Sequence, residues 1–277
     1  MTAQTILVLG STGKTGRRVA ERLAFRHLPV RHGSRSATPP FDWDDRATWA
    51  PALDRVRAVY VSYYPDLAAE GAADAIQSFT DLAVKSSVRR LVLLSGRGEA
   101  EAQRCEEIVR QCGIEWTLLR CSWFAQNFSE AHFLEPILAG DVALPVAEIG
   151  EPFVDADDIA DAAVAALTQD GHAGQLYELT GPRLWTFAQA IDEIARATGR
   201  PIRFTRIPAE QYVAALEEAQ LPPQLVDLIR YLFTEVLDGR NASAADGVAR
   251  ALGRPARDFT DYVRETAATG IWGGASR

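Results

Sequence analysis

Three glycines that follow a short aliphatic run constrain the fold of this chain more than any other feature. Residues 6–9 read Ile-Leu-Val-Leu, as expected of a strand that is buried on both faces. Gly10, Gly13 and Gly16 follow, and apolar residues then recur at helical spacing. A strand, a glycine turn and a helix in this order form a cradle for the pyrophosphate of a dinucleotide. We therefore predict a dinucleotide site at residues 10–16.

The end of this turn, Gly13-Lys14-Thr15, also imitates the end of a P-loop. A P-loop needs another glycine five residues before Gly13, and Val8 stands there, inside the predicted strand. The dinucleotide interpretation is therefore favoured over a nucleotide hydrolase. A turn with only a structural role and a site for another phosphate ligand are the other two alternatives.

Strands and helices alternate after the glycine turn. We expect strands at 29–34, 58–62, 91–95 and 114–120, and helices at 46–53, 66–85 and 99–111. This alternation predicts an α/β fold with a Rossmann-type, doubly wound parallel sheet. Ligands of such sheets lie beyond the carboxyl ends of the strands. This rule gathers residues 10–16, 62–64, 95–98 and 121–124 around one crevice.

The second half of the chain changes character. Its elements are an aromatic-rich segment before Pro136, a helix that Asp155 opens, a strand at 176–180, a helix at 187–198, a strand at 202–207 and mainly helix to Ala268. Thr186 and Gln189 have the spacing of a capping box. We predict that residues 1–123, completed by 154–180, form the dinucleotide-binding core. Residues 124–153 and 181–277 are predicted to form a smaller, mainly helical substrate-binding lobe within one compact unit.

The segment after the second predicted strand bears on the choice of dinucleotide. NAD-selective folds place an acidic residue there, whereas this chain has Gly33-Ser34-Arg35. An arginine can pair with a 2′-phosphate, and a serine hydroxyl can add a hydrogen bond. These residues favour NADPH over NADH, although a solvated loop arginine is the alternative. Asp42 and Trp43 could flank the adenine, and Asp44 or Asp45 could cap the following helix.

Composition excludes several classes of function. The 277 residues carry a formal net charge of −8, which argues against a general nucleic-acid binder. The three cysteines lack metal-ligand spacing and suggest reduced thiols in a cytoplasmic protein, and the four histidines form no credible metal or triad set. No apolar run approaches the length that spans a membrane, and the first strand leaves no room for a signal peptide.

Several motifs together resemble the atypical short-chain dehydrogenase/reductases, in particular their NmrA-like branch, which includes triphenylmethane reductase. Besides the glycine turn, these motifs are Gly33-Ser34-Arg35-Ser36, Leu93-Leu94-Ser95, Leu119-Arg120-x-x-Trp123-Phe124-x-x-Asn127-Phe128 and Val154-x-Ala156-Asp157-Asp158-Ile159-Ala160. Phe41-Asp42-Trp43, Trp49 and Arg254-Pro255-x-Arg257-Asp258-Phe259 are similar to the festuclavine/agroclavine dehydrogenases of ergot alkaloid biosynthesis. The resemblance runs nearly end to end, and its core motifs are specific for the superfamily.

The resemblance implies a role for each group of residues around NADPH. The pyrophosphate would be bound by Gly10, Thr12, Gly13, Lys14, Thr15 and Gly16. The 2′-phosphate would be bound by Ser34 and Arg35. Ser62 and Tyr63 would line the middle of the cofactor, and the nicotinamide would be bordered by Ser95, Gly96, Cys121, Ser122, Trp123 and Phe124. An aromatic substrate pocket would comprise Tyr64, Trp123, Phe124, Asn127 and Phe128, although core packing is an equal alternative for the single aromatic residues.

One departure from typical members of the superfamily narrows the chemistry. Their catalytic Tyr-x-x-x-Lys pair belongs about a dozen residues after Ser95, where residues 103–111 contain neither tyrosine nor lysine. A ketone reductase needs a proton donor for the alkoxide that hydride addition creates. An iminium instead becomes a neutral amine, and a quinone or enone can be protonated late by water. Ser95 and Tyr63 are the candidate catalytic residues, although a serine that ends a strand is more often a local hydrogen-bonding residue.

The leading hypothesis is an NADPH-dependent reductase that transfers hydride to a hydrophobic conjugated or iminium-type small molecule (iminium, quinone or enone). The alternative is a non-catalytic NADP(H)-binding redox sensor of the NmrA type. An epimerase or dehydratase on the same fold ranks third, because the tyrosine and lysine are missing. We expect no nucleic-acid partner and no membrane, and a monomer or homodimer.

Overall fold

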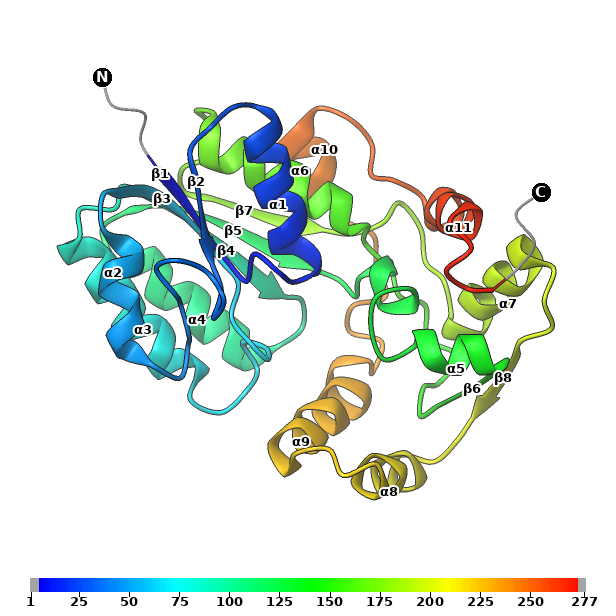
Figure 1. Cartoon of the computed structure of the whole chain (residues 1–277). Helices are drawn as coiled ribbons and strands as arrows, with labels where there is room; N and C mark the ends of the chain where they lie inside the picture. Colours follow the sequence, from blue (N-terminus) through cyan, green and yellow to red (C-terminus); the bar gives the residue numbers. More distant parts are fainter. Residues whose placement is uncertain (1–4, 274–277) are drawn as a thin grey trace. The chain divides into compact units, whose positions relative to one another are not determined.

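Six parallel strands form one sheet in the first of the two units into which the chain divides (Figure 1). The computed structural model describes residues 5–273. The first unit takes the described residues of Met1–Cys121, Ala156–Leu179 and Asp246–Arg254, and the second those of Ser122–Asp155, Thr180–Ala245 and Pro255–Arg277. In chain order the strands of the sheet are β1 (Thr5–Leu9), β2 (Val30–Gly33), β3 (Val56–Val61), β4 (Arg90–Gly96), β5 (Glu115–Cys121) and β7 (Gln175–Leu179).

The order of the strands across the sheet is β2-β1-β3-β4-β5-β7. Leu7 pairs with Arg31 on one side and with Val59 on the other, so the strand before the glycine turn lies inside the sheet. Leu7, Val8 and Leu9 are fully buried, as their uninterrupted apolar run predicts. The predicted α/β fold with a doubly wound parallel sheet is confirmed.

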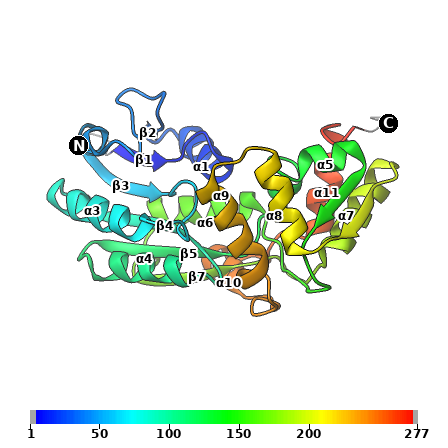
Figure 2. The ribbon, with the colours of Figure 1, turned by 90° about the horizontal axis from the view of Figure 1, so that it is seen from below.

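Helices cover both faces of this sheet (Figures 1 and 2). On one face lie α1 (Lys14–Phe25), α6 (Ala156–Thr168) and α10 (Gly247–Leu252), and on the other α2 (Trp49–Leu53), α3 (Ala72–Lys85) and α4 (Ala100–Gln111). The sequence of α6 is rich in alanine, and its residues 162–167 are all buried. Small side chains let α6 pack closely against α1 as well as against the middle strands.

Ion pairs fasten α1 to α6. Arg22 of α1 donates to Asp161 at 2.7 Å and to Asp157 at 2.5 Å. Arg254 approaches Asp158 at 2.7 Å and Asp161 at 2.6 Å. Because Asp158 is completely buried, its charge requires this partner. These ion pairs hold α1, the helix that follows the glycine turn, against α6 in the first unit.

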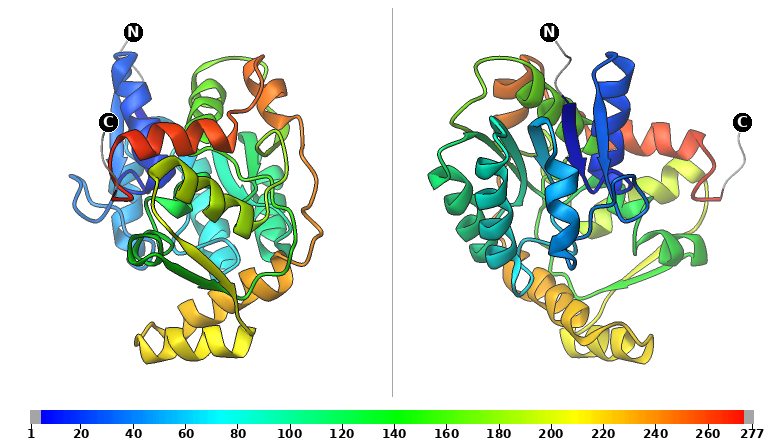
Figure 3. Two further views of the ribbon diagram at one scale, coloured as in Figure 1. Left: turned by 90° about the vertical axis from the view of Figure 1, so that its right-hand side faces the viewer. Right: turned by 60° about the vertical axis from the view of Figure 1, so that its left-hand side comes forward.

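The second unit is mainly helical and contains a two-stranded parallel ladder. Its elements are α5 (Leu134–Ala139), β6 (Asp141–Leu144), α7 (Phe187–Thr198), β8 (Arg203–Arg206), α8 (Ala209–Glu218), α9 (Pro223–Tyr231) and α11 (Phe259–Ala268). The ladder pairs β6 with β8, and Figure 3 shows α7 and α11 side by side. Thr186 and Gln189 form the predicted capping box of α7, with hydrogen bonds of 3.1 and 2.9 Å. An aromatic cluster fills the core of this unit.

Two expectations about secondary structure differ from the structure. The helix predicted from residue 66 begins at Ala72, because Asp66 instead accepts a hydrogen bond from the Ala68 amide at 2.8 Å and holds a turn. Gly71, with φ of +81°, then precedes the helix. The short elements α5 and β6 lie at and after the end of the aromatic-rich segment, where the sequence predicts neither helix nor strand.

Phe128 gives a test of the aromatic core. It is fully buried, and its ring centroid lies 5.2 Å from those of Phe133 and Phe153. We expect Phe128→Ala to lower the free energy of unfolding by about 3–5 kcal/mol, because the cavity removes packing on every side. The matched control is Phe25→Ala, whose side chain is 87% exposed and which should change this free energy by less than about 0.5 kcal/mol in urea titrations. Equal changes for the two variants would contradict the placement of Phe128.

Candidate cofactor and active site

The glycine turn brings α1 into direct contact with the end of β1. Gly10 has φ of +65°, a conformation that favours glycine, and its carbonyl accepts a hydrogen bond from the Gly13 amide at 2.8 Å. A Cβ atom at Gly16 would lie 2.2 Å from the Gly10 carbonyl oxygen. Only glycine therefore fits at position 16 without moving the helix away from its strand.

The N-terminus of α1 is open to an anion. Gly13 is its N-cap, no side chain caps the helix, and no acidic residue stands in its first turn. The first amides of a helix lack intrahelical acceptors, and the helix dipole favours negative charge at this end. The turn and the helix end therefore fit a pyrophosphate, in agreement with the assignment of Gly10, Thr12, Gly13, Lys14, Thr15 and Gly16, which stays a prediction.

A cavity of about 550 Å³ runs along the edge strand β2 and reaches the glycine turn. Thr12 and Ser34, both predicted for the cofactor, line it together with Ser11 and Ser36. The Ser11 hydroxyl is buried and has no hydrogen-bond partner. Prediction from the sequence missed Ser11, although its position directly after Gly10 was a usable signal. A buried hydroxyl without a partner is suited to a polar ligand in this cavity.

Ser34 and Arg35 follow β2 without an acidic neighbour. The Ser34 carbonyl accepts hydrogen bonds from the amides of Ala37 and Phe41, at 3.1 and 2.9 Å, which give the loop a defined path. Arg35 is exposed, and no ion pair involves it within residues 5–273. Its guanidinium is available for a phosphate.

Trp43 is held between two loops of the first unit. Its indole nitrogen donates to the Ser62 carbonyl at 3.1 Å, and its ring lies 4.9 Å from that of Tyr63 and 5.0 Å from that of Phe41. The Asp42 carboxylate accepts from the Asp44 amide at 3.2 Å. The proposed contacts of Asp42 and Trp43 with adenine stay predictions. Of the two candidate caps, Asp45 caps the following 3₁₀ turn through the Ala47 amide.

The residues after β3 differ in exposure. The Ser62 side chain lies beside Gly10, at 3.3 Å from the position of a Cβ atom there, and so reaches the glycine turn. Tyr63 is half-buried, and burial raises the pKa of its phenol, with a smaller contribution from the Asp44 carboxylate. Its phenol therefore stays protonated at neutral pH. Tyr64, predicted for the substrate pocket, is 75% exposed.

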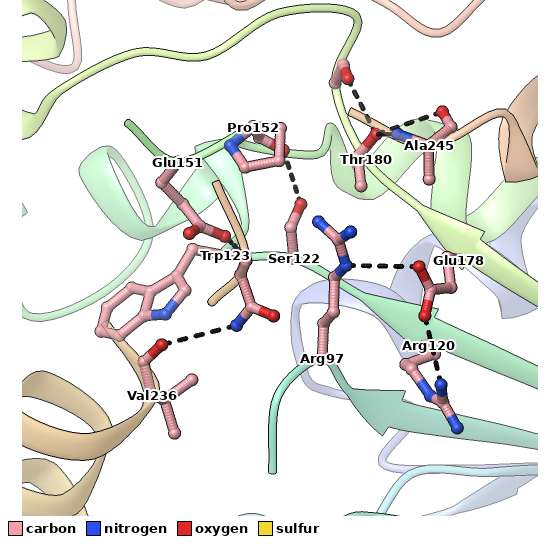
Figure 4. A network of polar contacts seen from close by, with 12 residues as sticks. Arg97, Arg120, Ser122, Trp123, Glu151, Pro152, Glu178, Thr180, Val236 and Ala245 are labelled. Atoms are coloured by element: carbon pink, nitrogen blue, oxygen red, sulfur yellow. Dashed lines mark hydrogen bonds and ion pairs between the residues drawn. The ribbon is translucent and has the colours of Figure 1, made fainter. Parts of the chain in front are cut away.

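Ser95 belongs to a buried network of polar side chains. Its hydroxyl donates to Glu106 at 2.7 Å, and Glu106 also accepts from Arg120 at 2.9 Å. Figure 4 shows Arg120 and Arg97 on the two oxygens of Glu178, at 3.1 and 3.4 Å. The hydroxyl proton of Ser95 is thus engaged inside the fold. This geometry favours the local hydrogen-bonding role over the catalytic one, which stays a prediction, as does the place of Gly96 beside the nicotinamide.

The segment after β5 crosses from the first unit into the second. Cys121 is buried at the end of the strand, where desolvation and the nearby Glu99 raise the pKa of its thiol. Ser122 donates its hydroxyl to the Pro152 carbonyl at 2.6 Å, and the Trp123 amide donates to Glu151 at 3.3 Å, both within the second unit (Figure 4). Contacts of these residues and of Phe124 with a nicotinamide stay predictions.

Trp123 is the predicted pocket residue that best fits a ligand surface in the second unit. It is partly buried, and its ring lies 5.2 Å from that of Phe233, on the π-helical turn Leu232–Val236. Phe124 and Asn127 are also partly buried. Phe128, by contrast, is enclosed by other aromatic rings, so its geometry favours core packing over the pocket.

Two carboxyl groups at the end of the sheet were missed by sequence reasoning. Asp66 and Glu99 follow β3 and β4, and their side chains hydrogen-bond to each other. The sequence gives only a weak signal, because both residues stand where a helix was predicted to begin and an acidic cap is ordinary. Their proximity depends on the paths of the two loops.

No group of His, Cys, Asp and Glu within residues 5–273 could hold a metal ion. In the same part of the chain, no helix is both long and apolar enough to cross a membrane.

Comparison with known proteins gives full-length relatives, although no family model matches the chain. It is 32% identical to the (4-alkanoyl-5-oxo-2,5-dihydrofuran-3-yl)methyl phosphate reductase of Streptomyces griseus, over 95% of this chain and 98% of that protein. It is 30% identical to the agroclavine dehydrogenase of Claviceps fusiformis, over 94% and 96%. Among solved structures, the triphenylmethane reductase of Citrobacter sp. complexed with NADP(H) is 17% identical, with a TM-score of 0.73 over 95% of this chain and 99% of that one.

The two roles considered for Ser95 predict different effects of Ser95→Ala. A local role means the loss of one hydrogen bond to a carboxylate that keeps Arg120, so we expect the free energy of unfolding to fall by about 1–3 kcal/mol and turnover to change little. If Ser95 is the proton donor, its loss should instead lower turnover by about 10²-fold or more. Steady-state kinetics alongside urea titration separates the two roles, and a large loss of turnover at unchanged stability would contradict the local role.

Proposed function

Because this chain belongs to the NmrA-like branch of the atypical short-chain dehydrogenase/reductases, we propose that it is an NADPH-dependent reductase of small molecules. We infer that its hydride acceptors are hydrophobic and either conjugated or of the iminium type. The relatives in this branch include named reductases and dehydrogenases, which supports enzymatic activity over a purely structural role.

The observation that carries the proposal is the uncapped N-terminus of α1 beside an acid-free end of β2. The former supplies amide donors to a pyrophosphate, and the latter supplies Ser34 and Arg35 where an NAD-selective site would have a carboxylate. A carboxylate there would repel a 2′-phosphate, whereas an arginine attracts it. The relative from Citrobacter holds NADP(H) in its crystal structure, which supports the same cofactor here.

NADPH, when bound, supplies the hydride. The chain's own residues bind and orient it: the glycine turn and α1 hold the pyrophosphate, Ser34 and Arg35 hold the 2′-phosphate, and the loops after β3 and β4 border the rest. Such positioning can provide a large part of the rate acceleration when two reactants are held together.

The acceptor class follows from the absence of the usual donor pair. Residues 103–111 lie in α4, where Glu106 is engaged with Ser95 and Arg120. This helix contains no tyrosine or lysine that could protonate an alkoxide. Iminium ions, quinones and enones suit such a site better than simple ketones. The names of the relatives include a clavine dehydrogenase and a reductase of an alkanoyl dihydrofuranone, which supports acceptors of these classes.

Cofactor selectivity is tested by Arg35→Ala. Loss of a charge-assisted contact should weaken NADPH binding by about 2 kcal/mol, or about 30-fold in Kd, while NADH binding stays nearly unchanged. Titration calorimetry with both cofactors measures this difference. Arg26→Ala, an exposed arginine at the other end of α1, is the matched control. Equal losses for NADPH and NADH in Arg35→Ala would defeat the assignment of the 2′-phosphate.

Turnover is tested with purified protein, NADPH and panels of quinones, enones and cyclic iminium ions. We expect oxidation of NADPH with at least one acceptor and little reaction with simple aliphatic ketones. Tight NADPH binding without oxidation by any panel would contradict the reductase and favour the redox-sensor alternative. That alternative would require a protein partner whose affinity differs between NADP⁺ and NADPH.

A further inference from the structure

The hydrogen bond between Asp66 and Glu99 joins two loops at the carboxyl end of the sheet in the first unit. Asp66 lies in the loop after β3, where it also accepts from the Ala68 amide at 2.8 Å. Glu99 stands directly before α4 as its N-cap, and its side chain makes no capping hydrogen bond. The Glu99 carboxyl group therefore contacts Asp66 and does not cap α4.

Such a contact requires a proton. An ionised carboxylate can only accept hydrogen bonds, so two carboxyl groups joined by one must share at least one proton. Burial, which disfavours the charged form, raises the pKa of both groups, and the charge of Asp66 raises that of Glu99 further. Glu106 also raises the pKa of Glu99. No cation counteracts these effects among the causes of either shift.

The Glu99 carboxyl group lies beside Gly96 and is almost inaccessible to solvent. Glu99 is only 7% exposed, and its buried Oε2 accepts no hydrogen bond from an N–H or O–H donor. A Cβ atom at Gly96 would lie 2.0 Å from Glu99 Oε1 and 2.3 Å from Oε2, so the carboxyl group occupies the space that any side chain at position 96 would fill. Gly96 is one of the residues predicted to border the nicotinamide. Because no donor stabilises a negative charge on this buried oxygen, the carboxyl group beside Gly96 favours its protonated form.

We propose that the Asp66–Glu99 pair is the proton source of the reductase, taking the place of the missing tyrosine and lysine. The proposal rests on the proposed function. Hydride addition to the acceptor forms a C–H bond and leaves an oxyanion or enolate. Glu99 gives its proton to that anion, an O–H or C–H bond forms, and the pair is left with one more negative charge. Asp66, which is half-buried, takes up a proton from water and restores the pair.

This assignment sharpens the acceptor class. A quinone or an enone becomes an anion on hydride addition and gains from a positioned acid, whereas an iminium becomes a neutral amine and does not. A shared proton in a carboxyl pair would be of no use to an iminium reductase. Quinones and enones are therefore the preferred acceptors.

The phenol and thiol groups near this part of the sheet are weaker acids than a carboxyl group. Burial raises the pKa of the Tyr63 phenol and of the Cys121 thiol, and raises that of Cys105 to about 12. A raised pKa in a phenol or thiol makes it a poorer proton donor at neutral pH. A carboxylic acid with a raised pKa is protonated over a wider pH range and still donates its proton more readily than a buried phenol or thiol. The titratable groups around the pair are Glu106 and Cys105 on α4 and Cys121 at the end of β5.

Infrared spectroscopy of the cofactor-free protein tests for the proton without any turnover. We expect a carbonyl band of a protonated carboxylic acid at neutral pH, lost in both Glu99→Gln and Asp66→Asn. Glu101→Gln is the matched control, because Glu101 lies two residues further along, at the surface beside Arg104. If neither substitution removes such a band at neutral pH, the proposal is overturned.

Kinetics then test the use of the proton. Glu99→Gln keeps the shape of the side chain but cannot release a proton, so we expect turnover with a quinone to fall by about 10²-fold or more, with that of an iminium nearly unchanged. The wild-type rate with the quinone should decline as the pH rises and the pair ionises, and this decline should disappear in Glu99→Gln. Equal losses with both acceptors would indicate a structural role and reject the proposal. If the wild-type protein oxidises NADPH with neither acceptor, the proposed reductase activity is contradicted, and the proposed proton source is contradicted together with it.

Discussion

The close approach of Gly16 to the Gly10 carbonyl is the contact on which the first unit depends. It lets α1 begin directly behind β1, so that the helix N-terminus points at the place where the strand ends. Arg22, further along α1, binds two aspartates of α6, and the alanines of α6 let that helix lie close against the sheet. The open helix N-terminus that we assign to the pyrophosphate is therefore a consequence of how tightly one helix packs against its strand.

Much of this arrangement can be read from the sequence, because its signals are local. A strand buried on both faces appears as a continuous apolar run, and the capping box at Thr186 and Gln189 depends on four consecutive residues. The short α5 and β6 contain too few residues for the apolar periodicity of a helix or of a strand to be recognised. The turn at Asp66 could not be distinguished from a helix start, since an aspartate serves both. Contacts between loops, such as that of Asp66 with Glu99, depend on tertiary packing and leave no local signal.

The polar groups at the carboxyl end of the sheet divide into two kinds. Ser95 and Arg120 both donate hydrogen bonds to Glu106, which favours a local role for this serine over the predicted catalytic one. The buried Oε2 of Glu99, by contrast, accepts no hydrogen bond from an N–H or O–H donor. In a fold whose helix α4 lacks a tyrosine and a lysine, an acid supplied by loops can serve the same need. Such an acid serves acceptors that become anions on hydride addition, and an iminium ion is not one of them.

Single-turnover oxidation of NADPH that carries deuterium at the transferred position of C4 tests directly whether this chain transfers hydride. With a quinone or enone in excess, we expect NADPH bound to the protein to be oxidised with a primary isotope effect. For an enone, we also expect one deuterium at carbon in each molecule of product. Tightly bound NADPH that survives every acceptor, or oxidation in which the deuterium never leaves the cofactor, would contradict this transfer.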